Sequence, residues 1–194
     1  MVDAQLWIAA HGVARYQWRI KVAKHRKLKG KEKEFLAESI AKWVPIARCD
    51  AHPFRIMARR EIRMLFWRWT ADGVDVKTGA VMPDSLKYSE KFQLFSKKAS
   101  KALHSRKGRK PLRHEHAVPR ETLADHIIKQ QMRVDEIVKF LNKFCRAVVV
   151  THREHKKLGH QRKEAWGFKT GNAFVRYRDA FGRDWRTTFL CSRK

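Results

Sequence analysis

The residue types best suited to chemistry gather in two short segments. Residues 114–119 read His-Glu-His-Ala-Val-Pro, and residues 151–155 read Thr-His-Arg-Glu-His. A carboxylate is a hard oxygen ligand for a divalent cation, while an imidazole can bind a metal or take a proton from water near neutral pH. The two segments therefore predict a site that combines metal binding with proton transfer.

The order of these residues resembles the HNH, or ββα-metal, endonucleases. Their first motif is an acidic residue, usually Asp, followed directly by His, two further residues and Pro; here the acidic residue is Glu115, and His116 and Pro119 follow it. A later strand and helix deliver a second His, which matches His155 after the apolar run 146–150. The resemblance covers about a quarter of the chain.

The resemblance implies a metal-dependent endonuclease that hydrolyses DNA phosphodiester bonds. His116 would be the general base, and Glu115 and His155 would hold one divalent cation, Mg²⁺ or alternatively Mn²⁺, which stabilises charge on the phosphate. Basic residues beside the two motifs are the predicted phosphate ligands, namely Arg113, Arg120, Lys156 and Lys157. The additional candidates for the site are His114, His152, His160 and Asn142.

Three features depart from the usual family pattern. The acidic residue is Glu115 rather than Asp, which lengthens the arm toward the metal. A helical stretch, residues 121–144, replaces the short Gly- and Asn-containing loop between the two strands, so that Asn142 is the nearby Asn. The chain has three Cys and no Cys-x-x-Cys pair, so no structural zinc is predicted.

The charge of the chain points to a polyanionic partner. Lys and Arg number 45 against 19 Asp and Glu, and the formal net charge is +26. Each phosphate that a Lys or Arg neutralises releases counterions, so nucleic acid is the expected partner, DNA rather than RNA. The alternative function is a non-catalytic basic DNA- or RNA-binding protein, such as a phage can encode. An acidic nucleic-acid mimic is disfavoured because its charge would be the reverse.

The expected fold class is α+β, with three parts. Residues 1–95 form a largely helical, basic, nucleic-acid-binding part, residues 96–111 a basic linker or arm, and residues 112–194 an HNH-like catalytic part. Apolar residues at helical spacing support the first part: Leu36, Ile40, Trp43 and Val44, then Ile62, Leu65, Phe66 and Trp69. Pro45 and Pro53 bracket the break between these helices. Trp67 and Trp69 could stack on bases but fit packing roles better.

The catalytic part is expected to contain two strands and a helix. Residues 112–118 read as an extended stretch, and residues 146–150 are β-branched and apolar, which is typical of a buried strand. Thr151 and Glu154 form a capping-box pattern at the start of a helix that carries His155. Residues 174–178 alternate apolar and basic side chains, which predicts a strand with one phosphate-facing side.

The sequence also predicts where the protein works. No segment is apolar enough to span a membrane, and the first residues lack a basic start followed by an apolar run. A cytoplasmic or nucleoid-associated protein without a membrane partner is therefore expected. A homodimer would suit an enzyme that cuts a palindromic site, because the twofold symmetry of the dimer would match that of the DNA.

Overall fold

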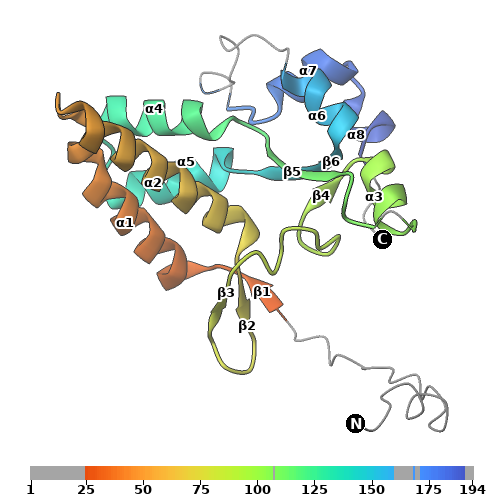
Figure 1. Cartoon of the computed structure of the whole chain (residues 1–194), viewed down its shortest axis with the longest axis horizontal. Coiled ribbons are helices and arrows are strands. Elements are labelled where there is room, and N and C mark those ends of the chain that lie inside the picture. The colour runs from red at the N-terminus through yellow and green to blue at the C-terminus, as the bar shows by residue number, and fades with distance from the viewer. Residues whose placement is uncertain (1–24, 107, 160–167, 169–170, 191–194) are drawn as a thin grey trace, which may run out of the picture.

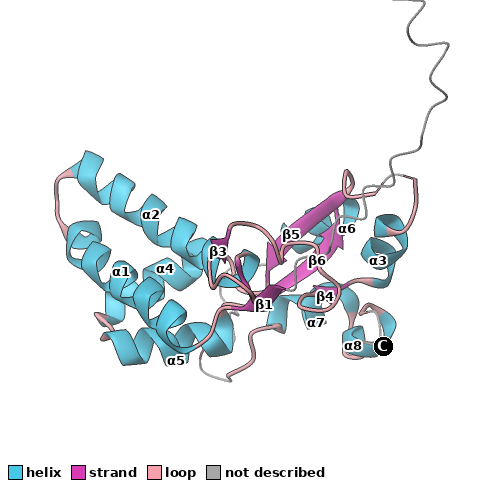
Figure 2. Cartoon of the chain, turned by 90° about the horizontal axis from the view of Figure 1, so that it is seen from below, coloured by secondary structure: helices cyan, strands magenta, loops and turns pink. Residues whose placement is uncertain are grey.

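The fold is mixed α+β, as predicted. The computed structural model describes residues 25–106, 108–159, 168 and 171–190. Within these residues, four long helices form one part, and a three-stranded sheet with four shorter helices forms the other; Figures 1 and 2 show them as two arms of a curved molecule. The long helices are α1 (Gly30–Arg48), α2 (His52–Ala71), α4 (Arg120–Gln130) and α5 (Val134–Phe144).

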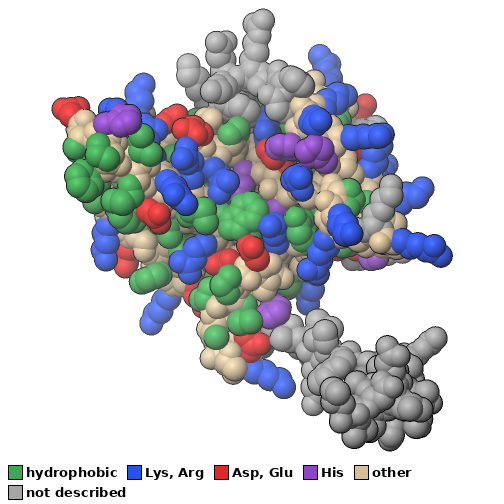
Figure 3. Space-filling view, viewed as in Figure 1, with side chains coloured by type: hydrophobic (Ala, Val, Ile, Leu, Met, Phe, Trp, Pro, Cys, Tyr) green, Lys and Arg blue, Asp and Glu red, His purple; other side chains and the backbone are tan. Residues whose placement is uncertain are grey.

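Basic side chains are spread over both parts of the molecule. Figure 3 shows Lys and Arg across the whole width of the face that it presents, with few Asp and Glu between them. The positive charge is thus not confined to one loop or one helix. A long polyanion could contact both arms, since each neutralised phosphate adds affinity.

The helices α1 and α2 form an antiparallel hairpin whose buried residues follow the predicted stripes. Pro53 lies in the first turn of α2, where a missing N–H costs nothing. The break at residues 49–51 lies between Pro45 and Pro53, as predicted, although Pro45 lies inside the last turns of α1 rather than after its end. Pro45 removes one backbone hydrogen bond in the last turns of the helix, and buried Val44 and Ala47 hold those turns against the core.

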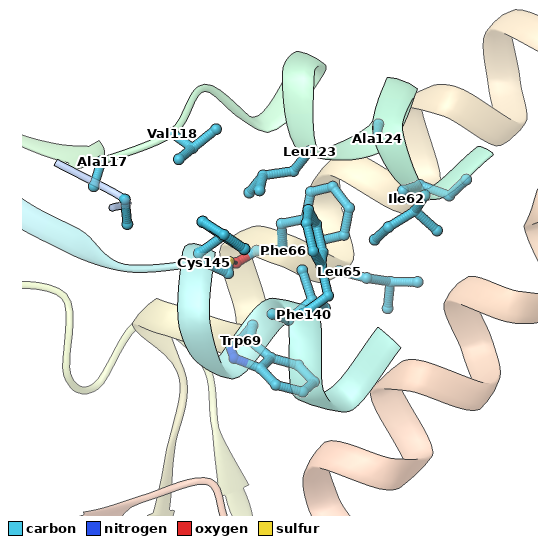
Figure 4. Packing of buried hydrophobic residues seen from close by; sticks show 14 of the residues in the cluster. Ile62, Leu65, Phe66, Trp69, Ala117, Val118, Leu123, Ala124, Phe140 and Cys145 are labelled. Carbon is cyan, nitrogen blue, oxygen red and sulfur yellow. Dashed lines mark hydrogen bonds between the residues drawn. The ribbon is translucent and has the colours of Figure 1, made fainter. Parts of the chain in front are cut away.

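The helices α4 and α5 pack on this hairpin and close one continuous core. Figure 4 shows Phe66 of α2 between Leu123 of α4 and Phe140 of α5, with Cys145 close by. Phe66 and Leu123 have no exposed surface. The predicted helical stretch 121–144 is therefore two helices, and they are separated at Gln131, which has a positive φ of 51°.

A first small sheet lies at the end of the hairpin. It contains β1 (His25–Lys27), β2 (Gly73–Asp75) and β3 (Val81–Met82), all antiparallel. Gly73 is required here, because a Cβ at this position would lie 2.5 Å from Ser85 Oγ and 2.9 Å from Leu86 Cγ. In this sheet the chain that leaves α2 pairs as β2 with β1 on one side and β3 on the other.

The second sheet carries the predicted motif residues. Its order is β4 (Leu94–Phe95), β6 (Ala147–Thr151) and β5 (Leu112–His116), with β4 parallel and β5 antiparallel to β6. The helix α6 (His152–Gly159) follows β6 directly. The predicted capping box is confirmed, since Thr151 N donates to Glu154 Oε2 at 2.8 Å and Glu154 N donates to Thr151 Oγ1 at 3.3 Å.

Two segments differ from their predicted structure. The predicted linker contains a helix, α3 (Lys97–Leu103), which begins because Ser96 Oγ accepts a hydrogen bond from Ala99 N and which buries Ala99 against the sheet. The predicted strand 174–178 is mostly helix α7 (Val175–Phe181). Its aromatic residues pack on α8 (Trp185–Thr188), with the Tyr177 and Trp185 rings 5.4 Å apart.

The first and third predicted parts share one core, and Ala99 of the predicted linker packs in a second, smaller cluster. The boundary after residue 95 falls at the end of β4, which pairs with β6 from the predicted catalytic part. Buried residues of α1, α2, α4, α5, β6 and α7 belong to a single cluster. None of the helices among the described residues is long and apolar enough to cross a membrane.

Candidate functional site

The strand β5 separates its motif residues onto two faces. Successive side chains of a strand point in opposite directions, so Leu112, His114 and His116 lie on one face and Arg113 and Glu115 on the other. The first face packs toward α2 and is buried. The second face turns toward α6 and α7, where the Glu115 carboxylate meets its partners.

Glu115 contacts the motif His of α6. His155 Nδ1 lies 2.7 Å from Glu115 Oε2, although the two residues are 40 positions apart. The Glu115 side chain is 15% exposed and that of His155 is 43% exposed. The structure therefore brings together the two predicted metal ligands, one from the strand and one from the helix, at a place that solvent reaches.

Arg176 of α7 holds the other oxygen of Glu115. Its guanidinium donates to Glu115 Oε1, to His116 O and, at 2.9 Å, to Ala117 O. The Arg176 side chain is 6% exposed. This buried fork fixes the carboxylate and the end of β5 together, so that Oε2 stays directed toward His155.

Several of the predicted phosphate ligands and additional candidates share the strand or helix that carries this pair. Arg113 lies two residues before Glu115 on the same strand face and is exposed. Lys156 and His152 on α6 are also exposed, and the His152 ring centroid is 6.3 Å from that of His155. Lys157 instead lies over the Phe181 ring of α7 at 5.0 Å. His152 is thus the candidate with a ring contact to the pair, while Arg113 and Lys156 are exposed on the same strand and helix.

His116 does not lie beside the pair. Its Nε2 is 3.1 Å from Thr70 Oγ1 and 3.3 Å from Phe66 O, both on α2, and only 5% of the residue is exposed. A general base must come within hydrogen-bond reach of the water that it activates. Regular alternation along β5 turns His116 away from Glu115, so these contacts do not support its predicted role.

His114 shares the buried face with His116. Neither of its ring nitrogens has a hydrogen-bond partner among the described residues, and its ring lies 4.9 Å from that of Trp67. Burial, together with the nearby Lys87, lowers the pKa of His114 to about 4. Burial, with a smaller effect of His114, also holds the pKa of His116 well below 6.5. Both imidazoles are neutral at pH 7.

Acid should therefore destabilise this fold at a mild pH. Because both folded-state pKa values lie below the unfolded value near 6.5, the stability from the neutral rings is complete above pH 6.5 and falls toward pH 4. The free energy of unfolding should drop by up to about 2.7 kcal/mol per pH unit for two protons. Urea unfolding between pH 7.5 and 5 measures this slope, and His114→Phe should roughly halve it. Equal slopes for the two proteins would contradict the assignment.

The remaining candidates lie elsewhere. Asn142 is exposed on α5 and accepts a hydrogen bond from Lys33 of α1, away from Glu115. Arg120 lies at the start of α4, half-buried, with its guanidinium over the Trp67 ring. His160 lies outside the described residues.

A divalent cation fits this site with two ligands from the chain. Among the described residues no three His, Cys, Asp or Glu side chains form a metal-binding group. Mg²⁺ is often held by one or two carboxylates, with water and substrate phosphate supplying the other oxygens. The Glu115 carboxylate suits that mode, the part-exposed imidazole of His155 would add a nitrogen ligand, and Arg176 offsets one negative charge.

Sequence analysis missed Arg176 as a site residue. It lies 61 residues after Glu115, and the alternation around it suggested a strand whose basic residues face phosphate. Instead α7 buries the Arg176 side chain. An Arg between apolar and aromatic residues was the available signal, because a buried Arg needs a carboxylate partner.

Comparisons with known proteins do not assign this arrangement to a family. A scan against models of protein families found no match, and neither did searches of curated proteins and of solved structures.

Proposed function

We propose that this chain is a metal-dependent nuclease that hydrolyses phosphodiester bonds in nucleic acid, with DNA as the preferred substrate. The contact between Glu115 Oε2 and His155 Nδ1 carries the proposal. The antiparallel strands β5 and β6 and the directly following α6 bring these two residues to one place. The resemblance to HNH endonucleases requires two metal ligands in this relation.

Each residue of the site has a distinct task. Glu115 and His155 would hold the cation, and Arg176 would keep the carboxylate in position from the protein side. The cation, when bound, would lower the pKa of a water molecule and stabilise charge on the phosphate. Arg113 and Lys156, both exposed, would bind the substrate phosphates next to the pair.

The general base that the resemblance implies, His116, lies on the opposite face of β5 from Glu115. His116 as the base stays a prediction, and its contacts with Thr70 and Phe66 favour a packing role instead. His155 offers a second chemical role for the same contact. A carboxylate that accepts a hydrogen bond from Nδ1 orients an imidazole for proton transfer at Nε2. Metal affinity of a His155 variant separates these two roles.

A non-catalytic nucleic-acid-binding protein is the second candidate function. It is favoured by the Arg176 and His155 contacts, because they satisfy the Glu115 carboxylate without any metal. A purely structural cluster of this kind would tie α6 and α7 to the sheet. The basic surface would then bind phosphates without cutting them.

The His155→Gln variant tests the proposed activity. Supercoiled DNA, linear DNA and RNA are incubated with the wild-type protein in Mg²⁺, in Mn²⁺ and in EDTA. Metal-dependent cutting is expected, with a loss of about a hundredfold or more in the variant, as for disrupted metal shells. His104→Gln is the matched control, because His104 Nε2 lies 2.8 Å from Glu90 in a similar pair that does not include a residue of the candidate site. Salt-sensitive binding without cutting in any metal would favour the second candidate.

A further inference from the structure

A second group of polar side chains lies on the other face of β5. Lys87 Nζ lies 4.6 Å from the centroid of the Trp67 ring, and Arg120 Cζ lies 5.3 Å from the same centroid. The His114 ring meets Trp67 edge to face at 4.9 Å. Two cations and an imidazole thus converge on one indole that is half-buried at the carboxyl-terminal end of α2.

The positive charge of this group is poorly compensated. Arg120 is half-buried, donates to Arg63 O at 3.2 Å and is in none of the ion pairs between described residues. The Asp84 carboxylate lies 4.0 Å from Lys87 Nζ and also accepts a hydrogen bond from Trp67 Nε1 at 2.6 Å. Asp84 is therefore the carboxylate in contact with Lys87, whereas Arg120 has none within ion-pair distance and feels the Glu115 charge only from farther away. A half-buried cation without a carboxylate in contact favours a bound anion.

His114 provides an independent observation. It is 7% exposed, and both its ring nitrogens are buried without a hydrogen-bond partner among the described residues. Buried polar groups are nearly always hydrogen-bonded, so such an atom calls for an explanation such as a ligand. An imidazole in either protonation state has at least one N–H to donate.

We propose that Lys87, Arg120 and His114 form a phosphate-binding site, with Trp67 as its support. The ligand is a backbone phosphate of the nucleic acid. Stacking of a base on Trp67 is disfavoured, because two cations already occupy positions over that ring. Figure 3 shows hydrophobic surface at this end of α2 bordered by Lys and Arg side chains.

The position of β5 relates this site to the pair of Glu115 and His155. β5 is an edge strand of its sheet, and His114 and Glu115 are consecutive residues that face opposite sides of it. His114 is buried on its face, so a polyanion that crosses this edge would meet Lys87, which is 26% exposed, on that side and the pair of Glu115 and His155 on the other. The inference rests on the proposed function only for the cutting of the strand, since phosphate binding requires neither metal nor catalysis.

Binding without cutting tests the site. Fluorescence anisotropy of a labelled DNA duplex is measured in EDTA over a range of KCl concentrations, for the wild-type protein and for Lys87→Gln and Arg120→Gln. Each variant should weaken binding about tenfold at low salt and reduce the slope of log affinity against log salt by about 0.9. Lys139→Gln is the control, since Lys139 is 81% exposed on α5 and its removal changes the net charge equally.

His114→Phe provides the second measurement. It keeps an aromatic ring against Trp67 but removes both buried nitrogens, so the melting temperature should stay the same or rise while DNA affinity falls severalfold. The site is refuted if His114→Phe binds DNA as the wild type does and Lys87→Gln behaves as Lys139→Gln does. If the wild-type protein does not cut DNA but these variants lose DNA affinity as expected, the proposed nuclease activity is refuted and the phosphate-binding site is not.

Discussion

Replacing Glu115 by Gln is expected to lower the rate of metal-dependent DNA cleavage by at least about a hundredfold. The amide has the shape of the carboxylate and can still accept hydrogen bonds from Arg176, but it lacks the charge that holds a divalent cation. DNA affinity in EDTA should change little. Cleavage is followed as the loss of supercoiled DNA, and affinity by anisotropy.

Glu90→Gln is the matched control for this variant. Glu90 accepts a hydrogen bond from Ser100 Oγ and contacts His104 Nε2, so the same chemical change is made in a pair that shares no residue with the candidate site. Its cleavage rate should match that of the wild type. If Glu115→Gln cuts DNA within about twofold of the wild-type rate, the carboxylate does not hold a catalytic cation.

The Arg176→Met variant is expected to lose about 3–5 kcal/mol of stability. The change leaves the Glu115 carboxylate, 15% exposed, without its cation, and it removes donors from His116 O and Ala117 O. Breaking one partner of a buried ion pair costs more than the pair contributes, because the remaining charge stays desolvated. Urea unfolding measures the loss.

Two further variants of α7 define the cause of that loss. Arg178→Met is made two residues along the same helix, where the side chain is 51% exposed, and should change stability by less than about 0.5 kcal/mol. Arg176→Lys keeps the charge without the planar fork and should restore only part of the stability. A loss below about 1 kcal/mol for Arg176→Met would mean that the fork does not organise the site.

The elements around the site could be predicted from local patterns. The run of β-branched residues before Thr151 predicts β6, and the Thr151 and Glu154 pair predicts the start of α6. Both signals act within a few residues, so no knowledge of the tertiary fold is required. The contact between Glu115 and His155 also follows. Because β5 and β6 pair in antiparallel fashion, the helix that follows β6 begins beside β5.

The parts that could not be predicted depend on tertiary packing. The alternation in residues 174–178 suits a strand, yet the aromatic contacts of Tyr177 with Trp185 and Phe189 stabilise a helix there. The direction in which His116 points is set by the regular pleat of β5 and by Thr70 of α2, 46 residues away. Neither partner can be identified from spacing along the chain.

A Mn²⁺ titration followed by electron paramagnetic resonance measures whether Glu115 and His155 hold one divalent cation. The wild-type protein should bind one Mn²⁺ at this site, and either Glu115→Gln or His155→Gln should abolish that binding while the fold, checked by circular dichroism, is retained. Undiminished Mn²⁺ binding in both variants, with or without cleavage, would show that Glu115 and His155 are not metal ligands and that their contact is structural.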